Sequence, residues 1–172
     1  METIQENELK NIWNMVFNLS LNFLHNEDAA EEATQEVFAK VCDSISSFRN
    51  ESSLSTWVYR IAYNYLIDQT RLHFKEEISF EMFEKDINNF EPFVNDFNLS
   101  ESEIKIYVEQ VKIGCTKAML QCLGSTDRFV FIIGKLFDFN SKDGSIICNM
   151  TDDVYRKRLS RATKKNNKFY DS

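Results

Sequence analysis

Glycine and proline are scarce in this chain of 172 residues, which has four glycines and one proline. Residues 1–91 contain neither type, and Pro92 stands alone in the middle of the chain. Because these two residues interrupt regular structure most strongly, such a stretch disfavours hairpins and favours helices. The sequence therefore predicts an all-α fold.

The usual marks of a metal site, an export signal or a membrane helix are also missing. The four cysteines have no CxxC spacing, and the two histidines lie far from them in sequence, which disfavours zinc and a disulfide framework. No run of about 18 apolar residues occurs, so no membrane span is expected. The first eight residues are acidic, so no signal peptide is expected either. We expect reduced thiols, no metal and a cytoplasmic protein.

Sequence motifs of common enzyme classes are absent as well. The chain has no GxSxG, P-loop or HExxH motif, and no glycine-rich loop that would follow a strand. Its acidic residues offer no evident pair for acid–base chemistry, and nothing brings His25 or His73 toward a cysteine. We expect no enzymatic activity and no cofactor.

Charge is distributed unevenly along a chain whose net charge is −7. Residues 1–48 carry 2 basic and 9 acidic groups, and residues 76–110 carry 2 and 10. Residues 151–172 have the opposite balance, with 7 basic and 3 acidic groups. Such asymmetry indicates several partners of different charge.

Amphipathic periodicity predicts three helices in the first half of the chain. Apolar residues recur at helical spacing from Leu9 to Leu24, from Ala30 to Ile45 and from Leu54 to Leu66, and Ser53 is the expected N-cap of the third helix. Short connections make this a small three-helix bundle, expected over residues 1–75.

The third predicted helix interleaves aromatic and basic residues. Helical spacing buries Trp57, Ile61 and Tyr65 on one side. Aromatic rings that stack on bases, with arginines that hold phosphates, suit single-stranded nucleic acid. A structural role, in which the aromatics are core and the arginines only solubilise, explains the composition slightly better. The side chains expected on the other faces are Tyr59, Arg60, Tyr63 and Asn64.

Periodicity fails between Phe74 and Leu99, an acidic segment that holds the one proline. We expect a Phe-rich linker over 76–99 and a second small helical domain over 100–172. Helices are predicted over 104–122 and 125–136, followed by a loop from Asp138 to Lys142, an apolar patch over 146–148 and a last helix capped by Thr151.

The last helix and the short helix before it have a helix-turn-helix layout, in which the second helix enters the DNA major groove. The alternative is a solvated basic helix end. The basic residues of the last helix are Arg156, Lys157, Arg158, Arg161, Lys164 and Lys165.

Two segments resemble one family. Ala30-Glu-Glu-Ala-Thr-Gln-Glu-Val-Phe38, followed by Phe48-Arg-Asn-Glu-Ser-Ser-Leu-Ser-Thr-Trp-Val-Tyr-Arg-Ile-Ala-Tyr-Asn64 and Asp68, resembles region 2 of bacterial RNA polymerase sigma factors. The match is best with the extracytoplasmic-function (ECF) group of the sigma-70 family. The tail Val154-Tyr-Arg-Lys-Arg-Leu-Ser-Arg-Ala162 resembles the recognition helix of region 4 in the same group.

The resemblance implies a nucleoid-associated transcription initiation factor that binds core RNA polymerase and directs it to promoter DNA. Region 2 would dock on the clamp helices of the polymerase largest subunit and melt the minus-ten element, and the basic helix of region 4 would bind DNA. The polymerase flap and an anti-sigma factor, or another DNA-targeting protein, are further expected partners. The residues at the clamp-binding positions are Glu31, Glu32, Gln35 and Glu36. The residues expected at the minus-ten element are Phe48, Arg49, Asn50, Ser53, Trp57, Tyr59, Arg60 and Asn64.

Region 4 departs from the family pattern at Asp143-Gly144-Ser145, where the family has Glu-Ile-Ala. Glycine inside a helix costs about 0.8–1 kcal/mol relative to alanine, so we expect a loose scaffold behind the recognition helix. Asn149, which tolerates a left-handed backbone, stands in place of the usual turn glycine. The alternative function is therefore a degenerate sigma-like adaptor with weak minus-35 recognition, positioned on DNA by another protein.

Overall fold

The computed structural model describes residues 6–73 and 119–167, and every regular element in these two ranges is helical. The all-α prediction is confirmed. The predicted linker and most of the helix predicted over 104–122 lie outside the described residues, and the domain boundaries stay predictions. The first range contains α1 (Glu6–Leu24), α2 (Glu27–Ser44), the 3-10 turn η1 (Ile45–Ser47) and α3 (Leu54–His73). The second contains α6 (Ser125–Phe131), the π-helical segment η3 (Ile132–Leu136), α7 (Ser141–Ile147) and α8 (Asp152–Asn167).

Polar side chains define where the helices begin. The Thr56 amide donates to Ser53 Oγ at 3.1 Å, and the Val154 amide donates to Thr151 Oγ1 at 3.4 Å, so both predicted caps are confirmed. Asn140 caps α7, because its Oδ1 accepts from the Asp143 amide at 3.0 Å. The loop predicted from Asp138 to Lys142 is therefore too long, since α7 already begins at Ser141.

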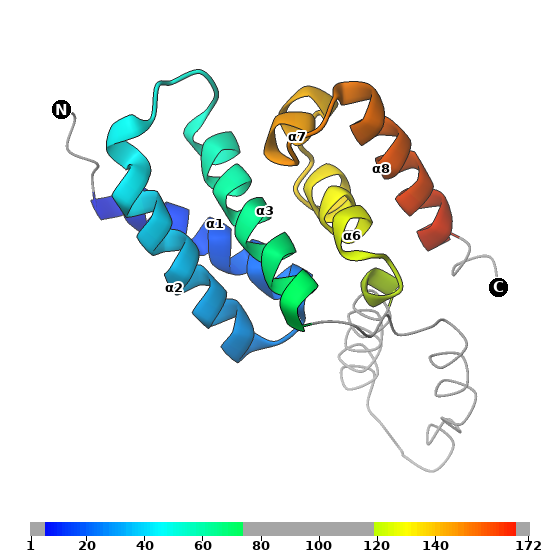
Figure 1. Ribbon diagram of the computed structural model, residues 1–172, viewed down its shortest axis with the longest axis horizontal. Coiled ribbons are helices and arrows are strands. Elements are labelled where there is room, and N and C mark those ends of the chain that lie inside the picture. Colours follow the sequence, from blue (N-terminus) through cyan, green and yellow to red (C-terminus); the bar gives the residue numbers. More distant parts are fainter. Residues whose placement is uncertain (1–5, 74–118, 168–172) are drawn as a thin grey trace, which may run out of the picture.

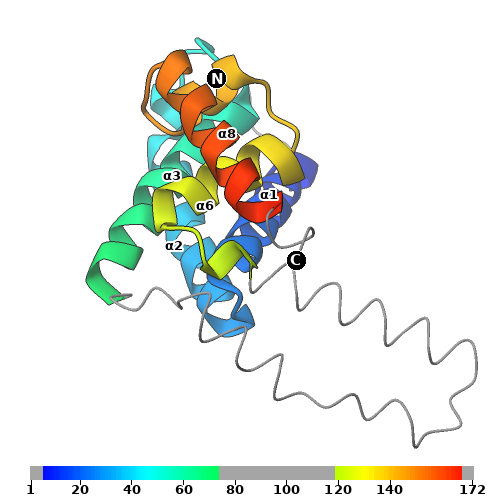
Figure 2. The same ribbon diagram turned by 90° about the vertical axis from the view of Figure 1, so that its right-hand side faces the viewer.

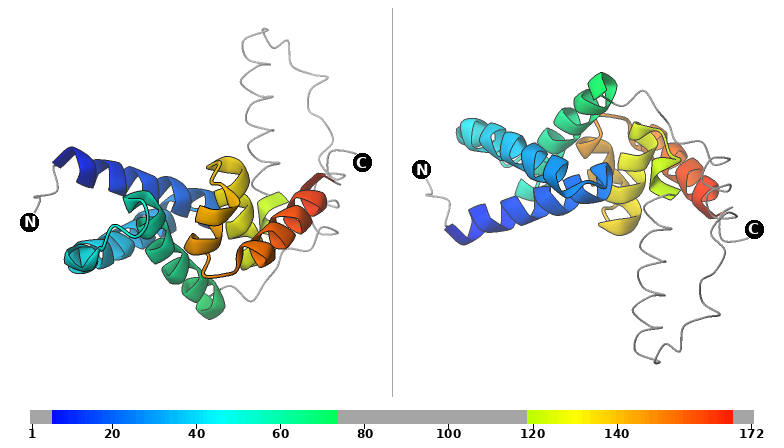
Figure 3. Two further views of the ribbon diagram at one scale, coloured as in Figure 1. Left: turned by 90° about the horizontal axis from the view of Figure 1, so that it is seen from above. Right: turned by 90° about the horizontal axis from the view of Figure 1, so that it is seen from below.

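Helix α3 lies between the α1–α2 pair and the C-terminal helices (Figure 1). On one side it contacts α1 and α2, and on the other it contacts α6 and α7. Helix α8 packs on α6 and α7 at the outer side of the molecule (Figures 2 and 3). The two described ranges thus form one packed body with α3 at its centre.

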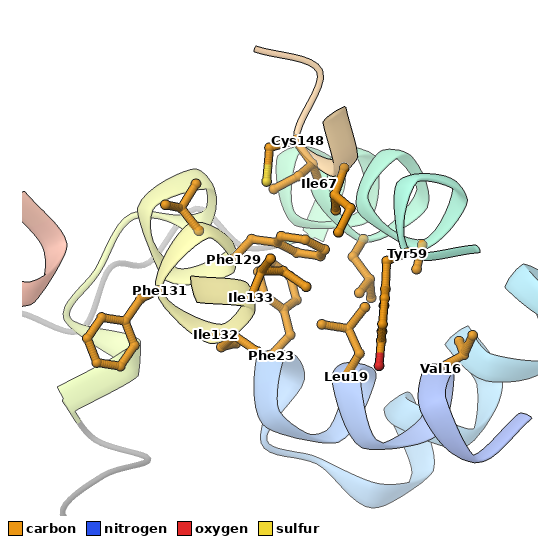
Figure 4. Close-up of a cluster of buried hydrophobic side chains, with 14 of the residues drawn as sticks. Val16, Leu19, Phe23, Tyr59, Ile67, Phe129, Phe131, Ile132, Ile133 and Cys148 are labelled. Atoms are coloured by element: carbon orange, nitrogen blue, oxygen red, sulfur yellow. The ribbon is translucent and has the colours of Figure 1, made fainter. Parts of the chain in front are cut away.

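A single hydrophobic core continues from the N-terminal to the C-terminal helices. The rings of Phe23 in α1 and Phe129 in α6 meet edge to face, with centroids 5.7 Å apart (Figure 4). Tyr63 of α3 meets Phe129 in the same manner at 4.9 Å. Aromatic pairs of this kind stabilise a core beyond the area they bury. The C-terminal helices are therefore held on the N-terminal bundle by core packing.

The inward face of α3 differs from the prediction. Trp57, Ile61 and Tyr65 are only partly buried. The buried positions include Val58 and Tyr59, and Tyr59 had been expected on another face. The reason is that α6 and α7 cover a face of α3 that an isolated three-helix bundle leaves to solvent.

The described residues offer neither a membrane-spanning helix nor a cluster of metal ligands. No helix there is long and apolar enough to cross a membrane. Within the same ranges, no group of three or more His, Cys, Asp and Glu side chains could hold a metal ion.

Candidate functional site

The predicted polymerase-binding residues of α2 lie together on the surface. Ala30, Ala33 and Val37 face the core, which turns the acidic side of the helix outward. A cluster of exposed carboxylates attracts a basic partner and repels nucleic acid. The exposed residues of this acidic face are Glu31, Glu32, Gln35 and Glu36.

The loop before α3 forms the first part of the predicted minus-ten surface. The Phe48 ring packs on Trp57, with centroids 5.2 Å apart, and fixes the loop to the start of α3. Asn50 has a φ of 55°, a left-handed conformation that asparagine tolerates, and marks the turn of the loop. Arg49, Asn50 and Ser53 are exposed, so their side chains are accessible to a ligand.

Farther along α3, the C-terminal segment contacts two of the predicted minus-ten residues, of which Tyr59 is buried and Asn64 is exposed. Tyr59 is 6% exposed, and its ring lies 5.7 Å from that of Phe137 and 5.3 Å from that of Phe139. Burial raises the pKa of its hydroxyl from 10.0 to about 12. Asn64 Oδ1 accepts a 2.8 Å hydrogen bond from Asn149 Nδ2. Arg60, by contrast, is exposed.

Arg128, which the sequence analysis did not single out, ties the two parts of the chain together. Its guanidinium donates to the carbonyl of Leu120 at 2.8 Å and to that of Phe23 at 3.3 Å. It also lies over the Phe23 ring, 5.6 Å from the centroid, in a cation–π contact. The sequence does contain one signal for this role, because Arg128 directly precedes the apolar run that begins at Phe129.

The scaffold behind α8 is packed where the sequence predicted a loose one. Gly144 is buried in α7, and a Cβ built there would overlap the ring of Tyr155 from α8. A Cβ at Gly134 would lie 2.8 Å from the Tyr155 hydroxyl oxygen. Tyr155 is fully buried, and burial raises the pKa of its hydroxyl. The tyrosine ring thus fills the space that a larger side chain at position 144 would take, and the expectation of a loose helix is wrong.

The turn into α8 follows the prediction. Asn149 has a φ of 50°, the left-handed conformation expected at this position. The Met150 amide donates to the Ser145 carbonyl at 3.0 Å, which closes the end of α7. The two helices are joined by a tight turn, as a helix-turn-helix requires.

The basic residues of α8 divide into two groups. Asp127 of α6 pairs with Arg158 at 2.6 Å and with Arg161 at 2.9 Å. Lys165 Nζ donates to the Cys122 carbonyl at 2.7 Å. These three cations hold α8 on its neighbours, and Asp127 is a residue that sequence reasoning missed. The other group makes no ion pair with another helix in the described part of the chain: Arg156 and Lys157, which pair one turn back with Asp152 and Asp153, and the exposed Lys164.

Comparison with known proteins agrees with this arrangement. Residues 13–73 match the family described as Sigma-70 region 2. A probable RNA polymerase sigma factor of Haemophilus influenzae is 22% identical over 175 residues, which cover 92% of this chain and 88% of that protein. The ECF RNA polymerase sigma factor SigW of Bacillus subtilis is 39% identical over 56 residues, 33% of this chain and 30% of SigW.

A solved structure extends the likeness to the whole fold. The sigma factor RpoE of Bartonella quintana, crystallised with the anti-sigma factor NepR, matches with a TM-score of 0.67 at 18% identity, over 96% of each chain. The region 2 match covers most of α1 and all of α2 and α3, and the structural match includes the helix-turn-helix. The region 2 match over residues 13–73, the sigma factor relatives and the shared fold together support an extracytoplasmic-function sigma factor of the sigma-70 family, a group of transcription initiation factors.

Proposed function

We propose that this protein binds core RNA polymerase through the acidic face of α2 and opens the minus-ten element with the loop before α3 and α3 itself. The observation that carries the first part is the joint exposure of Glu31, Glu32 and Glu36 on one helix face. A basic clamp-helix surface is the complementary partner, because opposite charges across an interface speed association and fix its register.

The loop and the start of α3 support the second part. Phe48 and Trp57 form a partly buried aromatic pair beside the exposed Arg49 and Arg60. Aromatic faces stabilise unstacked bases, while arginines hold the phosphates on either side. Extruding a base costs a few kcal/mol, which such contacts can offset.

The described structure corresponds, in this proposal, to a closed state. Tyr59 is buried against Phe137 and Phe139, so this side chain reaches promoter DNA only after the C-terminal helices move away. Asn64 is exposed, and it has only to give up its hydrogen bond to Asn149. Binding of polymerase supplies the free energy for this separation if the open form binds more tightly. An anti-sigma factor that binds the closed form would act in the opposite direction.

Helix α8 is the proposed DNA-binding helix of region 4, with Arg156, Lys157 and Lys164 exposed for contacts with duplex phosphates. The degenerate-adaptor alternative has less support, because its main argument was the glycine at position 144. Tyr155 packs directly on that glycine, so the departure from the family sequence is compensated within the same helix pair.

Reconstitution of the full chain with core RNA polymerase tests the proposal. We expect specific run-off transcripts whose start sites define a shared promoter. Arg60→Ala should reduce transcription from duplex promoters, and a template with a pre-melted bubble should restore it, since melting is then no longer needed. Absence of any specific transcript, or an equal defect on both templates, would contradict the melting assignment.

A further inference from the structure

A groove runs between α2 and α3 near the end of α1, with a volume of about 310 Å³. Its lining includes Ala33 and Leu66, which are almost completely buried and form an apolar floor. Its walls carry Ala29 and Glu32 from α2, and Tyr65 and Gln69 from α3. The groove is therefore apolar at the bottom and polar at the rim.

The rim has negative electrostatic potential. The Tyr65 hydroxyl has a raised pKa because of its burial and, in addition, because the carboxylates of Glu36 and Glu32 are close. Both glutamates are exposed, so they are available to a partner from outside. A phosphate would be repelled here, whereas a cationic side chain would be attracted.

We propose that this groove receives an arginine side chain from a basic helix of core RNA polymerase. The inference depends on the proposed function, in which the acidic face of α2 binds that enzyme. It extends the surface from the acidic face of α2 to Ala29 of the same helix and to Tyr65 and Gln69 of α3, which the sequence did not assign to any partner.

The chemistry of the groove matches the three parts of an arginine side chain. The apolar floor of Ala33 and Leu66 covers the aliphatic stem. The Tyr65 ring provides a face for the planar guanidinium, which stacks on aromatic rings more readily than a lysine ammonium does. Glu32 at the rim provides a carboxylate for charge-assisted hydrogen bonds.

Ala29→Trp tests the inference, because an indole at this half-buried position would fill the groove without changing any charge. Binding of the full-length chain to purified core RNA polymerase would be measured by fluorescence anisotropy. We expect at least about tenfold weaker binding, as for loss of one buried anchor. Asn14→Trp is the matched control, because it adds the same side chain at an exposed position of α1, ten residues before Leu24. Circular dichroism would establish that both variants are folded.

Two further variants keep the test decisive if Ala29→Trp does not fold. Tyr65→Phe should bind as the wild type does, because the ring remains, and Tyr65→Leu should bind more weakly. In a double-mutant cycle, Glu32→Gln should have little additional effect in the Tyr65→Leu background, since both changes weaken binding of the same arginine.

Separate outcomes distinguish the groove from the proposed function. If Glu31→Lys with Glu36→Lys abolishes binding but Ala29→Trp and Tyr65→Leu bind normally, the acidic face is retained and the groove proposal is overturned. If none of these variants changes binding, both proposals are wrong. A loss with Ala29→Trp and Tyr65→Leu, together with normal binding by Asn14→Trp, supports the groove.

Discussion

The ring of Tyr155 lies directly on Gly144, in the space that a side chain at position 144 would need. The two residues belong to α8 and α7, the paired helices of the helix-turn-helix. Tyr155 is fully buried there. A bulky residue opposite glycine is one way to keep core volume constant when a neighbouring position loses its side chain.

Gly144→Ala should therefore destabilise the protein, although alanine is the better helix former. Overpacking a close contact costs about 1–3 kcal/mol, which exceeds the gain in helix propensity of about 0.8–1 kcal/mol. Urea unfolding monitored by circular dichroism would measure the change.

The matched control is Lys142→Ala, at an exposed position of the same helix, which should change stability by less than about 0.5 kcal/mol. Tyr155→Val should cost less stability in the Gly144→Ala background than in the wild type, because the two side chains compete for one space. If Gly144→Ala proves as stable as the wild type, the packing described here is incorrect.

Stability should fall at alkaline pH, because three buried groups are held neutral in the folded protein. Burial raises the pKa of Tyr59 from 10.0 and that of Cys148 from 9.0, each to about 12, and it also raises the pKa of Tyr155. The unfolded chain therefore releases these protons first, so stability is present below pH 9 and is lost as pH rises through 9 to 12. Each group contributes at most about 1.4 kcal/mol per pH unit in this window.

Urea midpoints at pH 7, 9 and 10.5, chosen to bracket the ordinary pKa values of 9.0 and 10.0, would measure this dependence. Tyr155→Phe should make it shallower, because the ionisable group is gone while the ring remains. The hydroxyl of Tyr155 has no hydrogen-bond partner among the described residues, so its removal should cost little at pH 7. A dependence that is identical in both proteins would contradict the assignment.

The sequence predicted much of the local structure, because local signals determine it. Ser53 and Thr151 cap helices where their side chains predicted, and Asn149 has the left-handed backbone that its position in the turn suggested. The helices followed from 3.6-residue periodicity, which needs no knowledge of neighbours in space.

Long-range packing was not predictable from the same signals. The burial of Tyr59 depends on Phe137 and Phe139, which lie almost eighty residues farther along the chain. The cost assigned to Gly144 considered only helix propensity, whereas Tyr155 fills the adjacent space. The ion pairs of Arg158 and Arg161 were not predicted, because their partner, Asp127, is remote in sequence.

Cross-linking tests the closed state, because it would prevent the C-terminal helices from leaving α3. Asn64 and Asn149 are exposed and hydrogen-bonded at 2.8 Å, so cysteines at both positions can be joined by a short bis-maleimide in a background with Cys42→Ser and Cys115→Ser. We expect the cross-linked protein to support no open complex on a duplex promoter, as measured by permanganate reactivity. The same variant without cross-linker controls for the substitutions, and equal activity with and without the bridge would exclude a required opening.

Charge reversal tests the acidic face of α2. Glu32→Lys together with Glu36→Lys should abolish co-purification with core RNA polymerase, because like charges across an interface cost several kcal/mol. Glu8→Lys with Glu51→Lys makes the same change in net charge at exposed positions outside α2. Normal binding by a folded Glu32/Glu36 double variant would remove this face from the polymerase interface, whereas loss in both double variants would indicate only a general effect of charge.

The division of basic residues on α8 predicts unequal effects on DNA binding. Arg156 and Lys157 are exposed and pair only within their own helix, so each can exchange its aspartate for a phosphate. Arg156→Gln and Lys157→Gln should each reduce the salt slope of duplex binding by about 0.9, the contribution of one phosphate contact. Arg158→Gln should change the slope less and stability more, because Asp127, which is 20% exposed, would lose a partner at 2.6 Å.

Titrations of the full-length holoenzyme on duplex promoter DNA at several salt concentrations would measure the slope, and urea unfolding of each variant would measure its stability. A slope that drops equally for all three variants would show that Arg158 leaves Asp127 when DNA binds, and an unchanged slope in Arg156→Gln and Lys157→Gln would exclude these residues as phosphate contacts.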